Sequence, residues 1–190
     1  MGHGGTYFDD TDDIVTWFLE NPDLAKVGGL AFAIPGEVHG FWTLHQKYGK
    51  LPWKRLWTPS ISLSTHGYFV PEFIARFIQI FRTHFEQNRE EWAFLFSKDT
   101  GELLVEGEIL TRPQYAKTLE AISQDNGLHT FYEGYIAKHL VNAARHSGGI
   151  ITMDDFRRFF TEETDVLTTH AFNTQFITCP APSRYVGSKI

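Results

Sequence analysis

The stretch Gly28-Gly-Leu-Ala-Phe-Ala-Ile-Pro35-Gly-Glu-Val-His-Gly40 decides how the first part of this chain is expected to fold. Residues 28–35 are short, apolar and bounded by turn-forming residues, a pattern that predicts a buried strand. From Gly36 to Tyr48, apolar residues return every three or four positions, which predicts an amphipathic helix that ends at Gly49. The sequence therefore predicts a strand that turns sharply into a helix, because proline stops the strand and glycine permits the turn.

Helical patterns also dominate the rest of the chain, with proline and glycine residues between them. The further expected helices cover residues 12–20, 53–66 (bent or broken near Pro59), 71–85, 88–96, 113–124, 130–147 and 152–160. Side chains expected to face the core on these helices are Phe73, Ile74, Phe77, Ile78, Phe81, Phe85, Tyr115, Leu119 and Ile122. Thr152 and Asp155 have the spacing of a capping box. Residues 102–106 and 166–182 predict short strands, so the chain is expected to be mainly α with short flanking strands.

The composition excludes several classes of protein. The 190 residues are 42% hydrophobic, which is enough for a packed core and fits one domain or a piece of a larger one. The net charge is −6 and the basic residues are scattered, so nucleic-acid binding through phosphate contacts is not expected. The single cysteine, Cys179, excludes an internal disulfide and a zinc site built from several cysteines.

The N-terminal residues show no targeting signal of the secretory kind. A signal peptide places charged residues before an apolar run, and the first 13 residues here are glycine-rich and then acidic. No apolar run reaches the roughly 18 to 20 residues of a membrane span, so no span is expected. Residues 1–6 match the loose pattern for N-myristoylation at Gly2, without a basic second anchor. As written, the sequence predicts a chain that stays in the cytoplasm.

Residue chemistry alone assembles no catalytic set. The nine histidines form no H-E-x-x-H pair and no set with carboxylates, so neither a metal site nor a cofactor is predicted. Thr168-Thr169-His170 places a hydroxyl beside a base, but threonine nucleophiles generally act from the first residue of a chain. Only self-cleavage before Thr168 or Thr169 would expose such a residue. A polar entry into a strand is therefore the preferred interpretation of the triplet.

Several longer motifs, taken together, resemble a known family. The stretch at 28–40 is followed by His45-Gln-Lys-Tyr-Gly-Lys-Leu-Pro-Trp-Lys-Arg-Leu-Trp-Thr-Pro-Ser-Ile61, then by motifs at 118–122, 131–134 and 148–156. Their order and spacing are similar to the large subunit of the gamma-glutamyltranspeptidases (glutathione hydrolases). The residues that carry the resemblance, and for which it implies scaffold roles, are Gly28, Gly29, Pro35, Gly36, Glu37, Gly40, Gly49, Pro52, Trp53, Leu56, Pro59, Tyr132, Gly134, Gly148, Gly149 and Asp155. Trp53 and Leu56 are expected in the core, and Glu37, if buried, in an anchoring ion pair.

The resemblance implies the fold and chemistry of an N-terminal-nucleophile hydrolase. The chain would be the helical part of an αββα large subunit, incomplete by itself. Family members cut themselves to expose a threonine whose hydroxyl attacks the gamma-glutamyl carbonyl of glutathione or of gamma-glutamyl peptides. Water or an acceptor amine then takes the glutamyl group, and backbone amides stabilise the oxyanion. The implied partner is the small subunit that arises from the same precursor, and no cofactor is implied.

Parts of this sequence depart from the family pattern, and these departures decide what activity is expected of the chain. The resemblance covers residues 27–183, while residues 1–26 lack the family's Arg-Glu-x-Ala-Pro stretch and residues 184–190 leave its Pro-x-Pro-Ser-Ser-Gly pattern. In the family, the catalytic threonine, the substrate-binding aspartate and the oxyanion turn belong to the small subunit. The chain alone is therefore expected to be inactive, with no catalytic residue of its own.

Two alternatives remain open. One is a non-catalytic helical module that binds a partner subunit through apolar faces. The other is a fragment of a related acylase or capsule-processing enzyme of the same superfamily. Family members are usually exported or anchored facing outward, in contrast to the cytoplasmic expectation from this sequence.

Overall fold

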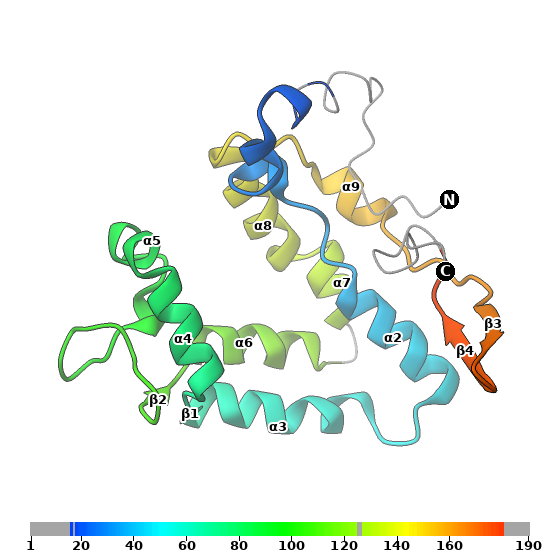
Figure 1. Cartoon of the computed structure of the whole chain (residues 1–190), viewed down its shortest axis with the longest axis horizontal. Helices are drawn as coiled ribbons and strands as arrows, with labels where there is room; N and C mark the ends of the chain where they lie inside the picture. Colours follow the sequence, from blue (N-terminus) through cyan, green and yellow to red (C-terminus); the bar gives the residue numbers. More distant parts are fainter. Residues whose placement is uncertain (1–15, 17, 125–126, 181–190) are drawn as a thin grey trace. The chain divides into compact units, whose positions relative to one another are not determined.

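The computed structural model describes Thr16, residues 18–124 and residues 127–180 (Figure 1). It separates into two compact units, one formed by Met1–Leu44 with Ala137–Ile190 and the other by His45–Ile136. The architecture is mostly helical, as the sequence predicts, and it contains two small antiparallel sheets. The proposed myristoylation pattern, the start of the 12–20 helix and the C-terminal departure lie outside the described residues, although Thr16 and residues 18–20 are helical.

The unit His45–Ile136 is built mainly from consecutive elements. These are α3 (Trp53–His66), β1 (Tyr68–Phe69), α4 (Glu72–Ile80), α5 (Arg82–Gln87), η3 (Ala93–Leu95), β2 (Ile109–Leu110), α6 (Pro113–Ile122) and α7 (Gly127–Tyr132). Strands β1 and β2 pair antiparallel, with Tyr68 opposite Leu110. Its central core cluster contains Val70, Ile78, Phe85, Leu95, Phe96, Leu103, Leu104 and Leu110. All of these residues lie between Val70 and Leu110, so this core is assembled from one contiguous stretch of the chain.

The other unit joins the two ends of the described chain. It contains η1 (Pro22–Ala25), η2 (Gly29–Ala31), most of α2 (Glu37–Tyr48) and of α8 (Tyr135–His146), α9 (Met153–Arg158), β3 (Leu167–Ala171) and β4 (Thr174–Thr178). Strands β3 and β4 form a hairpin with Leu167 opposite Thr178 and Ala171 opposite Thr174. Its buried apolar residues include Ile34, Ala137, Val141, Ala144, Ile151 and Phe156.

The expected strand at 28–35 is wrong. Gly29–Ala31 form a 3₁₀ turn, and Phe32 after it is extended without a strand partner among the described residues. Gly28 has φ 95°, a left-handed conformation that glycine adopts without strain and that interrupts a ladder. Within the run Gly29 and Ile34 are buried, and the ring of Phe32 packs on that of Phe156 in α9.

The aromatic stripe expected in one long helix is divided. The helix breaks at Phe81, whose φ of −103° and ψ of 19° lie outside the helical region, so that α4 and α5 are separate. Ile78 and Phe85 are buried as expected, whereas Phe73 is 74% exposed and Phe77 and Phe81 are also exposed. The periodicity identified the apolar face of the helix, but it did not show how much of that face would be buried.

Several other boundaries differ from the expectation. The 88–96 helix is reduced to η3, the 102–106 strand to an isolated bridge between Phe96 and Leu103, and Tyr115 is exposed rather than inward. The helix expected at 130–147 is two helices, α7 and α8, separated at Gly134. Helix α3 runs from Trp53 to His66 without a break at Pro59.

Candidate functional site

The two glycine pairs expected to be scaffold meet in one place. The N–H of Gly29 donates to the carbonyl oxygen of Ser147 at 2.9 Å, and Gly149 donates to that of Ala144 at 2.8 Å. A Cβ atom on Gly29 would lie 2.2 Å from both the Ala144 oxygen and the Gly149 nitrogen, so only glycine permits this crossing. Gly28 and Gly148 have φ values of 95° and 82°, in the left-handed region. The four glycines thus bring η2 and the end of α8 together.

The Pro35-Gly36 turn is held by the segment that follows α9. A Cβ atom on Gly36 would lie 2.7 Å from Cζ of Phe159, so the aromatic ring occupies the space that a side chain would need. Just before the turn, the ring of Phe32 stacks on that of Phe156, with centroids 6.4 Å apart. Phe156 is completely buried, so the chain leading into α2 packs against a buried aromatic side chain.

Glu37 and Gly40 occupy the first turns of α2. Glu37 is exposed and forms no ion pair with a described residue, so the anchoring ion pair expected for a buried Glu37 is not formed. Its place in the first turn lets its charge interact favourably with the helix dipole. Gly40 has no close neighbour, because its Cβ atom would be 4.0 Å from Oγ1 of Thr161.

His39 and Thr161 form a polar contact that no pattern in the sequence predicts. The two residues are 122 positions apart, yet Nδ1 of His39 lies 2.8 Å from Oγ1 of Thr161 and accepts the backbone N–H of Thr161 at 3.2 Å. Burial lowers the pKa of His39, although a backbone hydrogen bond partly opposes the shift. A hydroxyl beside an imidazole resembles a nucleophile with its base, but here the backbone N–H uses the same nitrogen. The contact therefore joins α2 to the chain after α9.

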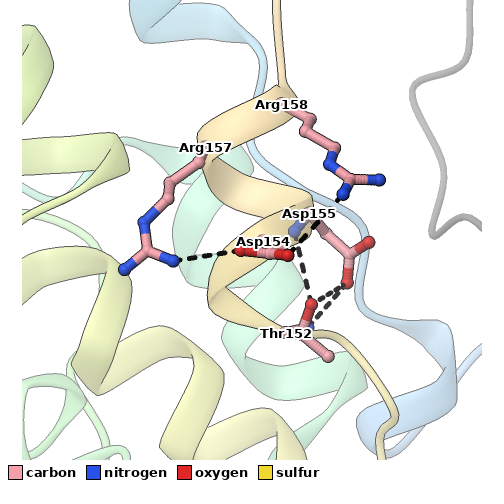
Figure 2. A network of polar contacts seen from close by, with 5 residues as sticks. All are labelled: Thr152, Asp154, Asp155, Arg157 and Arg158. Carbon is pink, nitrogen blue, oxygen red and sulfur yellow. Dashed lines mark hydrogen bonds and ion pairs between the residues drawn. The ribbon is translucent and has the colours of Figure 1, made fainter.

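The capping box predicted at Thr152 and Asp155 is confirmed (Figure 2). The backbone N–H of Asp155 donates to Thr152 Oγ1 at 3.3 Å, and the backbone N–H of Thr152 donates to Asp155 Oδ2 at 2.7 Å. Asp154 points away from this pair and contacts Arg157 at 3.0 Å and Arg158 at 3.7 Å. These exposed ion pairs add little stability, so the capping box is the main interaction that stabilises the start of α9.

In the unit His45–Ile136, Gly49, Pro52 and Trp53 organise the entry into α3. A Cβ atom on Gly49 would lie 2.4 Å from the His45 ring, whose Nε2 donates to the Leu51 carbonyl oxygen at 2.8 Å. Pro52 is the N-cap of α3. Trp53 donates through Nε1 to the carbonyl oxygen of Ile122 at 3.0 Å. This last bond ties the start of α3 to the end of α6.

The remaining scaffold residues have mixed environments. Leu56 is 47% exposed, so the expected core position is wrong in this chain. Pro59 is also exposed, within an unbroken α3. Tyr132 is buried against Phe131, and a Cβ atom on Gly134 would lie 2.6 Å from the Thr130 carbonyl oxygen, which fixes the break between α7 and α8.

The candidate reactive groups are not gathered into a site. Thr168, Thr169 and His170 lie on β3 and are exposed, as a polar strand segment would be. Within residues 18–124 and 127–180 with Thr16, no three His, Cys, Asp or Glu side chains are placed to hold a metal ion. No helix in the described part of the chain is long and apolar enough to cross a membrane.

Comparison with solved structures identifies the fold class. The gamma-glutamyltranspeptidase from Pseudomonas nitroreducens complexed with L-DON superposes with a TM-score of 0.74 at 31% identity, over 86% of this chain and 47% of that one. The Helicobacter pylori gamma-glutamyltranspeptidase gives a TM-score of 0.77 at 27% identity, over 85% of this chain and 46% of that one. The chain thus has the fold of part of a gamma-glutamyltranspeptidase-type, N-terminal-nucleophile hydrolase.

Sequence comparison then gives the family. The gamma-glutamyltranspeptidase family model matches residues 11–186, a span that begins before the residues over which the motifs were recognised. "Glutathione hydrolase proenzyme 1" of Schizosaccharomyces pombe is 34% identical over 165 residues, which are 87% of this chain and 26% of that protein. The chain belongs to the gamma-glutamyltranspeptidase family. It corresponds to the large-subunit region and spans about a quarter of the length of this relative.

Proposed function

We propose that this chain supplies structural framework, and no catalytic group, to the large subunit of a glutathione hydrolase with the αββα arrangement of its superfamily. The observation that carries the proposal is the glycine crossing, where Gly29 and Gly149 leave no room for side chains. The capping box at Thr152 and the Trp53 bond to α6 have similar structural roles. The motif residues therefore shape the backbone instead of presenting reactive atoms.

In this proposal, the reacting threonine and the oxyanion turn come from the small subunit. The substrate class would be gamma-glutamyl compounds such as glutathione, whose gamma-glutamyl group passes through an acyl-enzyme to water or an amine. Two findings support the assignment: the relatives are glutathione hydrolase proenzymes, and the chain spans about a quarter of one of them. Thr168 and Thr169, exposed within β3, are not the nucleophile.

The purified 190-residue chain should release no chromophore from a gamma-glutamyl anilide. A chain carrying both Thr168→Ala and Thr169→Ala is the control, and it should behave identically. Turnover by the unmodified chain that disappears in the double variant would show that these threonines react and would overturn the proposal.

A graft tests the framework role directly. Residues 28–180 replace the matching segment of the Schizosaccharomyces pombe proenzyme, and self-cleavage and anilide hydrolysis are measured. The graft should retain both reactions, and Thr168→Ala with Thr169→Ala in the graft should leave them unchanged. Gly29→Ala in the graft should lower both, because a methyl group does not fit at the η2 crossing and destabilises it. Activity that depends on the two threonines, or that is unchanged by Gly29→Ala, would contradict the proposal.

A second candidate function is a helical module that binds a partner subunit without catalysis. The observation favouring it is the set of exposed apolar residues within one unit: Phe69, Phe73, Phe77, Ile80, Phe81 and Ile109. A monomer that melts sharply and binds no apolar dye would exclude this function. A related acylase is separated from a glutathione hydrolase by profiling the graft against gamma-glutamyl and other acyl-amide substrates.

A further inference from the structure

The unit His45–Ile136 contains a cavity of about 850 Å³ that the proposed function does not use. It is lined by Phe69 of β1, by the chain around η3, by the chain at and around β2, and by the first residues of α6. Its volume is within the range of small-molecule sites. Because all lining residues belong to one compact unit, the cavity is a property of that unit alone.

The central feature of this cavity is Arg112, which lies between two aromatic rings. Its guanidinium carbon is 4.5 Å from the ring centroid of Phe94 and 4.3 Å from that of Tyr115. Its backbone is fixed as well, because its N–H donates to the Ser64 carbonyl oxygen at 2.8 Å and its own carbonyl accepts the N–H of Ala116 at 2.9 Å. The guanidinium plane is therefore held in place before any ligand arrives.

The edge of the Arg112 guanidinium is not used by the described part of the protein. Its N–H groups form no hydrogen bond or ion pair with a described residue. Arg89, in the same unit, also stacks on a ring, that of Phe96 at 4.0 Å, but its Nη2 donates to the Gly101 carbonyl oxygen. Arg89 thus has a structural hydrogen bond, whereas the donors of Arg112 have no partner among the described residues. A planar fork of donors with both faces covered is suited to a carboxylate, which accepts two parallel hydrogen bonds.

The other charges of the cavity restrict the ligand further. Glu90, Glu91 and Asp99 line it and form no ion pair with a described residue, while Lys98 is the only other basic group in the lining. Glu108 is already engaged, since its Oε2 accepts the N–H of Val105 at 2.8 Å. A multiply charged anion such as phosphate would be repelled by these carboxylates. A molecule with a carboxylate at one end and an ammonium at the other is attracted by both sets of groups.

We propose that this cavity binds a zwitterionic amino acid or short peptide, whose carboxylate pairs with the Arg112 guanidinium and whose ammonium faces Glu90 and Glu91. The apolar surfaces of Phe94 and Tyr115 contact the side chains of the ligand. The proposal does not rest on the glutathione hydrolase function, because none of these residues belongs to the family motifs quoted above.

The test is binding of alanyl-phenylalanine to the full 190-residue chain, followed by backbone amide NMR. Residues 90–115 should shift in a saturable manner. The C-terminally amidated and the N-acetylated dipeptides should each bind about tenfold more weakly, because each lacks one of the two charges. Inorganic phosphate at the same concentration should not compete.

Variants identify the groups responsible. Arg112→Gln should weaken binding of the free dipeptide about tenfold while leaving the weak binding of the amidated form unchanged. Arg76→Gln, an exposed arginine on α4 outside the cavity, is the matched control and should bind normally. Thermal unfolding of each variant confirms that the chain is folded. Equal binding of the amidated and free dipeptides, competition by phosphate, or normal binding by Arg112→Gln would each overturn the proposal.

Discussion

The two compact units are held together in different ways. In His45–Ile136 the central core cluster is aromatic and aliphatic, and its members lie between Val70 and Leu110. In the other unit the decisive contacts are long-range: Gly29 crosses Gly149, and His39 meets Thr161. A core of packed side chains tolerates a mismatch at its edges, as the exposed Phe73 illustrates. A backbone crossing tolerates no such mismatch, because the atoms that meet cannot move apart without losing hydrogen bonds.

The largest expected effect is in the core cluster of His45–Ile136. Phe85 is 3% exposed, so Phe85→Ala removes a buried ring and should lower the free energy of unfolding by about 4 kcal/mol. Phe73→Ala, on the same apolar stripe but 74% exposed, should cost less than about 1 kcal/mol. Urea unfolding of both variants measures the difference. Similar losses for the two would mean that Phe73 is buried against something in solution.

The next largest effect is at the crossing. Gly29→Ala places a methyl group 2.2 Å from backbone atoms of Ala144 and Gly149, and should destabilise the chain by about 2 to 3 kcal/mol. Gly40→Ala is the control, because its methyl group has open space inside a helix and should stabilise the chain by up to about 1 kcal/mol. The same substitution is therefore expected to change the free energy of unfolding in opposite directions at the two sites. A neutral Gly29→Ala would show that η2 and the end of α8 have room to separate.

A smaller effect is expected at the start of α9. Thr152→Ala removes the hydroxyl that accepts the Asp155 N–H, and should cost about 1 kcal/mol of unfolding free energy. Thr164→Ala, at an exposed position with no side-chain hydrogen bond to a described residue, serves as the reference and should change little. Thermal unfolding of the pair resolves the difference, and equal stabilities would argue against the capping box.

The smallest effect depends on pH. The pKa of His39 is lowered from its ordinary value of 6.5 by burial, so the folded state favours the neutral ring that accepts the Thr161 N–H. The resulting stabilisation is complete above pH 6.5 and is lost as the pH falls through the folded-state pKa. His39→Gln should therefore show a smaller decrease in melting temperature on acidification than the unmodified chain. Parallel profiles for the two proteins would contradict this assignment.

The sequence predicts what depends on local pattern and misses what depends on distant neighbours. Helices α2, α3 and α9 follow from apolar spacing, proline and the Thr152–Asp155 box, and their bounds agree closely with the structure. The strand at 28–35 was wrong because an apolar run looks the same whether it pairs in a sheet or packs against a helix end. The His39–Thr161 contact had no signal at all, since 122 residues separate its partners.

The scaffold residues could be recognised only through their combination of motifs. Nothing in the composition distinguishes Gly29, which no other residue can replace sterically, from Gly40, which has room for a side chain. Likewise, Arg112 and Arg89 look alike in the sequence, and only the contacts of their guanidinium groups separate a ligand candidate from a structural residue. The spacing of the motifs identifies the family, and the contacts in the structure show what role each residue has.

The β3–β4 hairpin has a practical consequence for handling the chain. Phe172 and Asn173 at its tip have φ values of 49° and 58°, and Phe172 is 94% exposed. The outer edge of each strand has no partner among the described residues, and all of β4 is exposed. Unpaired edges of this kind recruit strands from neighbouring molecules. We therefore expect concentrated solutions to become turbid through this hairpin first, and lysine substitutions along its outer edges to delay precipitation.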